Sequence, residues 1–442
     1  MIEYEKNPEE RALLVCIRLR EHSDHEVQSH VEELEGLCAT IGFVCCEEKI
    51  VIPLRNVNPG YFIGKGWAEE IAAQAEFLEA DYIVFDDNLS PRQQRNLEKL
   101  CTCPVIDRHQ IIVEIFAQRA QTREAKLQVE LAQLIYSLPR LRRMWTHLSR
   151  QQGGARGTRG EGETQLESDR RIVEARISRL KAELKQVRNQ RSTLRKQRES
   201  IPIPTAAIVG YTNAGKSSLH RALTSSQVFV EDKLFATLDP TTRGLKLPSG
   251  QKILISDTVG FIRKLPHDLV DAFRSTLEET VLSKFLLHLV DASSPDFHQH
   301  ITTTHSVLRD IGAVGRNEIL IFNKCDRLSP DDLKRIRGDY PQAVYVSVKN
   351  TFGLNNLLER LELELRRELQ RVQITLPHAY GNIIAIAHRE GQVISTDYRD
   401  NNVILQAYLP NRILNSLHKK YSGALVEILS ETFAEQNFLS ET

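Results

Sequence analysis

The chain has no apolar run that approaches the roughly 20 residues needed to cross a bilayer, although 41% of its 442 residues are hydrophobic. Its beginning, Met1 to Arg11, is polar and acidic, which suits neither a secretory signal nor a transit peptide. Seven cysteines, an odd number without a CxxC pair, favour reduced thiols over a disulfide framework or a zinc site. These absences argue against a membrane-spanning or secreted protein, and we expect a cytoplasmic one.

Net charge is also absent, because 58 Lys and Arg residues balance 58 Asp and Glu residues. The distribution is nevertheless uneven, since the segment from Arg140 to Glu199 holds seventeen basic and seven acidic residues, a balance near +10. A solvated helical face explains part of this excess. Because nucleic acids are recognised first through their phosphate charge, we also interpret the segment as an electrostatic footprint on phosphate.

A glycine-rich loop is the most informative motif that is present. It follows the apolar run Ala206 to Val209, which predicts a buried strand, and it precedes a helix-like stretch, Ser218 to Leu223, as a P-loop does. In such a loop the backbone N–H groups face a triphosphate, Lys216 neutralises the β- and γ-phosphates and the Ser217 hydroxyl ligates Mg²⁺. The predicted loop consists of Gly210, Tyr211, Thr212, Asn213, Ala214, Gly215, Lys216 and Ser217.

A second loop follows the strand-like run Lys252 to Ser256 and consists of Asp257, Thr258, Val259 and Gly260. Its position predicts that Asp257 holds Mg²⁺ directly or through a water, and that the backbone N–H of Gly260 senses the γ-phosphate. Phe261 comes next, where Ras-type GTPases have a glutamine that orients the attacking water. An apolar side chain cannot polarise water, so we assign no catalytic side chain in this switch II pair, Gly260 and Phe261, and predict slow hydrolysis without a partner.

Asn213 suggests a second cation besides Mg²⁺. Its amide is close to the phosphates by position, so it is a candidate to help hold K⁺ in place of an arginine finger. A hydrogen bond that stabilises the loop is the simpler alternative.

Base specificity is predicted by a third loop, which follows the apolar strand Ile319 to Phe322 and consists of Asn323, Lys324, Cys325 and Asp326. Asp326 can accept paired hydrogen bonds from guanine N1–H and the 2-amino group, whereas adenine offers neither donor in that arrangement. An unpaired carboxylate would cost several kcal/mol, so GTP and GDP are the expected ligands. A short match to the loop behind guanine O6, after the strand Ala343 to Val346, consists of Ser347, Val348 and Lys349.

Switch I is expected within Phe235 to Arg243, between the P-loop helix and the strands that lead to Asp257. One threonine there must move onto Mg²⁺ when a γ-phosphate is present. The residues alone leave Thr237, Thr241 and Thr242 as candidates.

An apolar seam predicts a long helix from about Ser168 to Lys196, because steps of four and three place its members on one face. The seam consists of Val173, Ile177, Leu180, Leu184, Val187 and Leu194, and a matching upstream seam of Leu127, Leu131, Leu134 and Leu138. Two such seams predict an antiparallel helical hairpin. The join, Arg150 to Thr164, has five glycines and three arginines, so it cannot pack a core and suits entry into an RNA cavity. The predicted RNA contacts of this join are Arg150, Gly153, Gly154, Arg156, Gly157 and Arg159.

The fold class is predicted to be α/β, with four parts. Alternating strands and helices before the hairpin predict a parallel α/β domain, with strands Ala12 to Leu19, Phe43 to Ile52, Tyr82 to Phe85 and Val105 to Ile106, and helices near Glu26 to Thr40, Trp67 to Leu78 and Pro91 to Leu100. After the nucleotide-binding core we expect helices Leu354 to Arg371, Gly381 to His388 and Asn411 to Tyr421, and strands Gln392 to Asp397 and Val403 to Tyr408. The expected domains are an N-terminal parallel α/β domain (1–120), an antiparallel helical hairpin (121–200), a P-loop GTPase domain (201–371) and a small C-terminal α+β domain (372–442).

Several long motifs resemble those of the HflX family of GTPases. They are Asp107-Arg108 leading into Ile115 to Ala120, then Lys126 to Leu134, Leu138 to Leu141, and Arg159 to Glu167 followed by Asp169 to Arg171. Glu161 stands where a proline is more usual. The likeness covers the first three parts of the chain and extends into the fourth.

The resemblance implies a GTPase that binds the large ribosomal subunit, is stimulated by it and splits or recycles stalled ribosomes after stress. By that likeness Thr237 is the switch I magnesium ligand, and the glycine-rich tip reaches toward the peptidyl-transferase region of ribosomal RNA. The segment that contacts the nucleotide is then Phe235, Ala236, Thr237, Leu238 and Asp239. The free protein is expected to be monomeric.

Two alternatives remain from the sequence. One is a GTPase that assembles the large subunit without splitting ribosomes. The other is a tRNA-modification GTPase, which shares the hydrophobic residue after the DxxG loop and the P-loop asparagine. That class needs a reactive cysteine near its C-terminus, and Phe438 to Thr442 has none.

Overall fold

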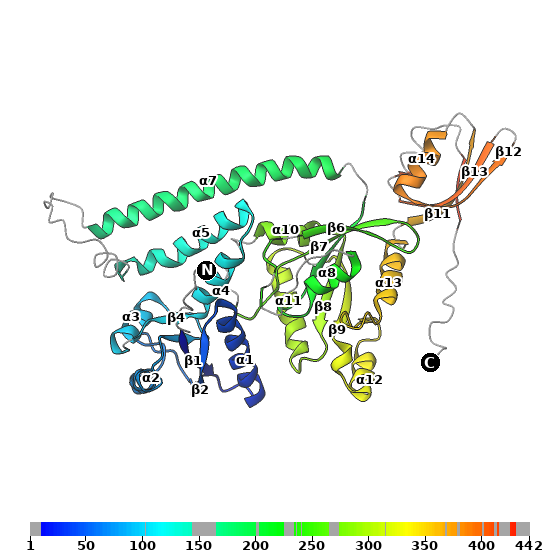
Figure 1. Ribbon diagram of the computed structural model, residues 1–442. Coiled ribbons are helices and arrows are strands. Elements are labelled where there is room, and N and C mark those ends of the chain that lie inside the picture. The colour runs from blue at the N-terminus through cyan, green and yellow to red at the C-terminus, as the bar shows by residue number, and fades with distance from the viewer. Residues whose placement is uncertain are drawn as a thin grey trace, which may run out of the picture.

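The computed structural model describes three sheets and a helical arm (Figure 1). It describes residues 10–101, 103–143, 165–199, 203–224, 234–235, 237–239, 241–264, 274–313, 315–366, 369–377, 381–399, 402–410, 413–414 and 425–429. The mixed α/β class predicted from the sequence is confirmed, including the parallel sheets and the antiparallel C-terminal sheet. No helix among these residues is long and apolar enough to cross a membrane.

The first sheet is parallel and has the strand order β2-β1-β3-β4. Six consecutive residues of β1 are buried, because helices cover both faces of such a sheet. The four predicted strands and three predicted helices are confirmed to within a few residues, whereas α4 was not predicted. The elements are β1 (Arg11–Arg18), α1 (Asp24–Ile41), β2 (Val44–Pro53), α2 (Lys65–Phe77), β3 (Tyr82–Phe85), α3 (Pro91–Leu100), β4 (Val105–Asp107) and α4 (Arg108–Arg119).

The arm is the predicted hairpin of two antiparallel helices, which lie side by side in Figure 1. Its elements are α5 (Arg123–Ser137), the 3₁₀ helix η1 (Leu138–Arg143) and α7 (Gln165–Glu199). The two seams meet in one apolar cluster that contains Leu127, Leu131, Ile177, Leu180 and Leu184. With 35 residues, α7 is about 50 Å long at 1.5 Å per residue. The glycine-rich join, with all six predicted rRNA contacts, lies outside the described residues.

The second sheet has the strand order β10-β9-β8-β5-β7-β6, in which only β6 is antiparallel to its neighbour. Its strands are β5 (Thr205–Val209), β6 (Thr241–Lys246), β7 (Lys252–Asp257), β8 (Phe285–Asp291), β9 (Asn317–Asn323) and β10 (Val344–Tyr345). The accompanying helices are α8 (Lys216–Thr224), α10 (Arg274–Leu282), α11 (Phe297–Asp310), η2 (Cys325–Arg327), α12 (Pro330–Asp339) and α13 (Leu354–Arg366). Every strand that precedes a predicted nucleotide loop is present.

The third sheet is antiparallel, with the order β12-β13-β11-β14. It consists of β11 (Leu369–Pro377), β12 (Gln392–Arg399), β13 (Asn402–Pro410) and β14 (Leu425–Ile428), with α14 (Gly381–Glu390) packed against it. The helix predicted from Leu354 to Arg371 is wrong at its end, because α13 stops at Arg366 and a strand follows. Of the helix predicted from Asn411 to Tyr421, only residues 413–414 are described, and they are helical.

The N-terminal and GTPase regions share one hydrophobic cluster. Phe116 of α4 and Phe235 of the switch I segment contact each other edge to face, with ring centroids 4.8 Å apart. The same cluster contains Tyr211 and Phe261, which flank the predicted phosphate site. The N-terminal region therefore packs directly against the loops that surround the phosphates.

Candidate nucleotide-binding site

The predicted phosphate loop curves closely against its neighbours and needs glycine at both ends. Gly210 has a φ of +144°, and a Cβ there would lie 2.1 Å from the carbonyl oxygen of Leu289. Gly215 has a φ of +94°, and its Cβ would lie 2.5 Å from Nδ2 of Asn323. Side chains would block both turns, since positive φ and close approach are what glycine permits. The loop connects β5 to α8, the context in which P-loops bind phosphate.

Lys216 is the buried cation of this loop. Its ammonium group donates a 2.7 Å hydrogen bond to the carbonyl oxygen of Tyr211, and only 7% of the residue is exposed. Burial lowers the pKa of Lys216 to about 8, although the Asp257 carboxylate opposes that shift. A phosphate anion would restore the electrostatic stabilisation that burial removes.

Three oxygen-bearing side chains converge beside Lys216. The Ser217 hydroxyl lies 2.6 Å from the Thr237 hydroxyl, which donates a 2.9 Å hydrogen bond to Oδ2 of Asp257. Oδ1 of Asp257 is buried and has no hydrogen-bond partner within the described residues. Hard oxygen donors and a carboxylate of this kind suit Mg²⁺. Among the candidate threonines, Thr242 instead pairs with Ser256 at 2.8 Å.

The switch II loop lies against the P-loop. A Cβ at Gly260 would be 2.9 Å from both Nζ of Lys216 and Cγ2 of Thr212, so only glycine fits here. Phe261 is fully buried, and its backbone exchanges hydrogen bonds with the P-loop, to the Gly210 carbonyl at 3.1 Å and from Thr212 N–H at 2.8 Å. Its ring belongs to the core cluster and not to an exposed site for water.

The guanine-side loops are tied to the P-loop by one side chain. Asn323 donates from Nδ2 to the carbonyl of Ala214 at 2.9 Å and accepts from the backbone N–H of Val348 at 3.1 Å. Asp326 is exposed and accepts a 2.6 Å hydrogen bond from the Ser347 hydroxyl, which lowers the pKa of its carboxyl group. Asp326 is thus held as a carboxylate that still faces solvent, as a base-reading group must be.

The remaining residues of these loops differ in whether their side chains face a neighbouring residue, the core or solvent. Lys324 has a φ of +61° and pairs with Asp291 at 2.7 Å. The buried Cys325 thiol donates to the carbonyl of Phe322 at 3.3 Å and so faces the core. Lys349 is exposed, whereas Thr258 and Val259 are buried.

The switch I segment faces the N-terminal region as well as the predicted metal site. Phe235 is buried against Phe116, and Leu238 is buried in the same cluster. Asp239 accepts hydrogen bonds from the backbone N–H groups of Gln121 at 3.0 Å and Thr122 at 3.1 Å. Nucleotide contact by Phe235, Leu238 and Asp239 stays a prediction, and Ala236 lies outside the described residues.

Comparisons with known proteins agree with this geometry. Three family models match, described as GTP-binding GTPase N-terminal over residues 28–117, GTP-binding GTPase Middle Region over residues 119–198 and 50S ribosome-binding GTPase over residues 205–324. A GTPase HflX from Lacrimispora saccharolytica is 45% identical over 86% of this chain and 91% of its own. The chain belongs to the HflX family of GTPases.

Another HflX relative, from Escherichia coli, is 42% identical over 85% of this chain and 87% of its own. A solved structure of a GTP-binding protein from Sulfolobus solfataricus in complex with GDP is 23% identical, covers 80% of this chain and 98% of that one, and has a TM-score of 0.42. The two HflX relatives confirm the resemblance seen in the sequence, and GTP hydrolysis to GDP and phosphate is the activity of this family.

Sequence reasoning missed the N-terminal residues that contact these HflX loops. The Tyr211 hydroxyl donates a hydrogen bond to Glu33 of α1, and Lys264, just after switch II, pairs with Asp86 at 2.8 Å and with Asp87 at 2.7 Å. Glu33 and Tyr211 are 178 positions apart. No local pattern could have indicated such a contact.

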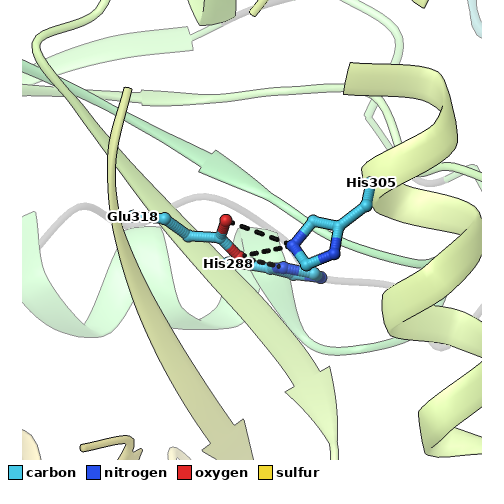
Figure 2. A group of neighbouring side chains, drawn as sticks. All are labelled: His288, His305 and Glu318. Atoms are coloured by element: carbon cyan, nitrogen blue, oxygen red, sulfur yellow. Dashed lines mark hydrogen bonds and ion pairs between the residues drawn. The ribbon is translucent and has the colours of Figure 1, made fainter. Parts of the chain in front are cut away.

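A second cluster of metal-ligating types lies in the same domain of this HflX chain (Figure 2). Glu318 Oε1 lies 2.7 Å from His288 Nδ1 and 3.0 Å from His305 Nε2. A metal on Nδ1 of His288 would put the ring proton on Nε2, which is buried and has no partner within the described residues. We therefore interpret the three residues as a hydrogen-bonded group and not as a metal site.

Proposed function

We propose that this HflX-family chain is a GTP-dependent factor that binds the large ribosomal subunit and splits or recycles stalled ribosomes. The observation that carries the nucleotide part is the convergence of Ser217, Thr237 and Asp257, linked by contacts of 2.6 and 2.9 Å beside the buried Lys216. The ribosomal part is supported by the match to a model described as a 50S ribosome-binding GTPase over residues 205–324 and by the basic arm.

In this proposal Ser217 and Thr237 would hold Mg²⁺, Asp257 would bind it directly or through a water, and Lys216 would neutralise the phosphates. Mg²⁺ supplies charge stabilisation for the β- and γ-phosphate oxygens when it is bound. Asp326 selects guanine because its carboxylate accepts from two donors that adenine lacks in that arrangement. The backbone N–H of Gly260 would report the γ-phosphate, since Gly260 lies so close to Lys216 that a Cβ there would be 2.9 Å from Nζ.

Hydrolysis by the free protein is proposed to be slow. Phe261 is buried and apolar, so it cannot orient a water as the glutamine of Ras-type enzymes does. Docking on the large subunit would then stimulate hydrolysis. Asn213, which is exposed and has a φ of +59°, is the candidate to help hold K⁺. A rate that is equal in Na⁺ and K⁺ would remove that role.

We propose that the arm separates the ribosomal subunits. The α5 and α7 helices pack through Leu127, Leu180 and Leu184 and form a stiff support for the glycine-rich tip. Arg150, Arg156 and Arg159 would contact ribosomal RNA by charge. Binding energy, and not the phosphate bond, separates the subunits, because a ligand shifts an equilibrium only by its differential affinity for the two states.

Co-sedimentation with separated ribosomal subunits under GDP, GTP and a non-hydrolysable GTP analogue tests this function. We expect the chain to bind the large subunit with GTP or the analogue and to dissociate with GDP. Equal binding under all three nucleotides would contradict a GTP-controlled switch. Binding to precursor large subunits without separation of whole ribosomes would favour the assembly alternative.

Removal of residues 153–162 tests the arm. We expect GTP affinity to stay within about twofold and subunit separation to be lost, because residues 153–162 contain none of the predicted nucleotide-binding residues. In a second variant, glycine and serine replace the same stretch at equal length. This variant keeps the length of the tip and removes its charge, so it shows which of the two subunit separation needs. Unchanged subunit separation by the trimmed chain would disprove the wedge.

A further inference from the structure

Tyr211, the second residue of the P-loop, points its side chain away from the loop and into the N-terminal region. Its carbonyl oxygen accepts the 2.7 Å hydrogen bond from Nζ of Lys216. Its hydroxyl oxygen accepts a 2.9 Å hydrogen bond from the backbone N–H of Arg263 and donates to Oε2 of Glu33. One residue therefore touches the phosphate-binding lysine, the switch II backbone and α1.

The Tyr211 hydroxyl donates to Glu33 and accepts from Arg263, and the charges around Glu33 favour this arrangement. Arg108, which is 1% exposed, pairs with Oε1 of Glu33 and at 2.6 Å with Asp86. Glu33 then acts as an acceptor, so the single hydroxyl proton of Tyr211 goes to Glu33. Burial raises the pKa of Tyr211, which keeps that proton in place at neutral pH. A lone pair of the Tyr211 oxygen is then free to accept from Arg263 N–H.

The segment that follows Gly260 is held on two sides by this arrangement. Arg263 is three positions after Gly260, and the next residue, Lys264, has a φ of +53° and pairs with both Asp86 and Asp87. The Phe261 backbone is bonded to the P-loop at the other end. Fixed donors around a developing charge accelerate a reaction because they need no reorganisation during it.

The hydroxyl of Tyr211 is separable from the packing of its ring. The ring stacks on His300 with centroids 3.9 Å apart and an interplanar angle of 13°, and the residue is 5% exposed within the shared core. Loss of the hydroxyl alone would leave this stacking intact. A phenylalanine at this position therefore removes the hydrogen bonds while it keeps the packing.

We propose that Tyr211 is a positioning residue for GTP hydrolysis, whose hydroxyl, oriented by Glu33, fixes the switch II backbone at Arg263 while its carbonyl fixes Lys216. Lys216 and the switch II backbone, which meet the γ-phosphate in the proposed function, are thereby kept in fixed relative positions by the N-terminal region. The inference rests on the proposed GTP-binding function and adds to it the residue that aligns the site.

Single-turnover GTP hydrolysis by the full chain, with GTP and GDP affinities measured alongside, tests this role. We expect Tyr211→Phe to slow hydrolysis about tenfold, which corresponds to about 1.4 kcal/mol, while both affinities stay within about twofold. Tyr136→Phe is the matched control, because its hydroxyl also donates to a carboxylate, Asp107 at 2.9 Å, but away from the nucleotide loops. That control is expected to hydrolyse GTP at the wild-type rate.

A double variant with Glu33→Gln tests the orientation. If Glu33 acts through the Tyr211 hydroxyl, the double variant hydrolyses GTP no more slowly than Tyr211→Phe alone. Single-turnover rates refer to nucleotide-bound protein, so a partly unfolded variant still gives a usable rate. A wild-type rate for Tyr211→Phe, a loss that matches a fall in GTP affinity, or an equal loss in Tyr136→Phe would overturn the role. Failure of the wild-type chain to bind GTP would instead overturn the proposed function.

Discussion

Asp239 of the switch I segment binds the beginning of the arm at Thr122. Its carboxylate accepts hydrogen bonds from the backbone N–H groups of Gln121 and Thr122 and from the Thr122 hydroxyl. The same hydroxyl oxygen accepts from Ala125 N–H at 3.1 Å and so caps α5. Two positions before Asp239, Thr237 touches Ser217 and Asp257. A movement of switch I therefore acts directly on the first turn of the arm.

We predict that Asp239→Ala loosens this junction. Amide hydrogen exchange at Gln121 and Thr122 should accelerate about tenfold or more, because a hydrogen bond to a charged acceptor contributes about 1.5–3 kcal/mol. Asp332→Ala is the control, since its carboxylate pairs with Ser329 at the start of α12. Unchanged exchange at Gln121 and Thr122 would show that Asp239 does not hold the arm.

We predict that Thr237→Ala weakens the binding of GTP but not that of GDP. The threonine hydroxyl should ligate Mg²⁺ only when a γ-phosphate is present, so GTP affinity should fall about tenfold while GDP affinity is nearly unchanged. Isothermal titration with both nucleotides in Mg²⁺ measures the difference. Thr242→Ala is a suitable comparison because that hydroxyl pairs with Ser256 instead. A parallel loss of GTP and GDP affinity would argue against the metal role.

We predict that Asp326→Asn changes the base preference. Asparagine presents an amide N–H₂ to the guanine 2-amino group, so two donors meet, and GTP affinity should drop about a hundredfold or more. Xanthosine triphosphate carries an acceptor at that position and should bind the variant better than it binds the wild type. Asp331→Asn, exposed on the neighbouring helix, should leave both affinities unchanged. The same preference for GTP in Asp326→Asn would exclude Asp326 as the base reader.

The local patterns in the sequence predicted more than the contacts between regions. The hairpin was predicted from the spacing of apolar residues, because the residues of a helical seam lie within one stretch of chain, and Leu180 and Leu184 are buried in it. The P-loop followed from its glycine and lysine positions in the same way. In contrast, the pairs Tyr211–Glu33 and Lys264–Asp86 join residues 178 positions apart, where no periodicity operates.

The strand β11 was not predicted, although the sequence contains a signal for it. The residues Val372, Ile374 and Leu376 are buried at alternate positions in β11, which is the period of a strand. The helix predicted to end at Arg371 covers the first three residues of this strand, Leu369 to Arg371. The antiparallel pairing with β13 decides between the two, and it is a tertiary contact.

We predict that Glu318 stabilises the fold in a pH-dependent way. Burial would raise the pKa of Glu318, but hydrogen bonds from His288 and His305 lower it from 4.5 to about 2. A carboxyl group whose pKa is lower in the folded chain contributes stability above the pKa of the unfolded chain, and that contribution is lost as the pH falls through the folded value. The Glu318 contribution should therefore be complete above about pH 4.5 and disappear toward about pH 2.

Thermal unfolding of Glu318→Gln at several pH values checks this. At neutral pH the variant should unfold a few degrees below the wild type, because about 1 kcal/mol shifts the Tm of a domain of this size by about 2–4 °C. The gap should persist on acidification to about pH 4.5 and then narrow. Glu359→Gln, at an exposed position of α13, should show no such gap. A gap of constant size down to the acid limit would mean that packing, and not the ionised carboxylate between His288 and His305, accounts for the loss.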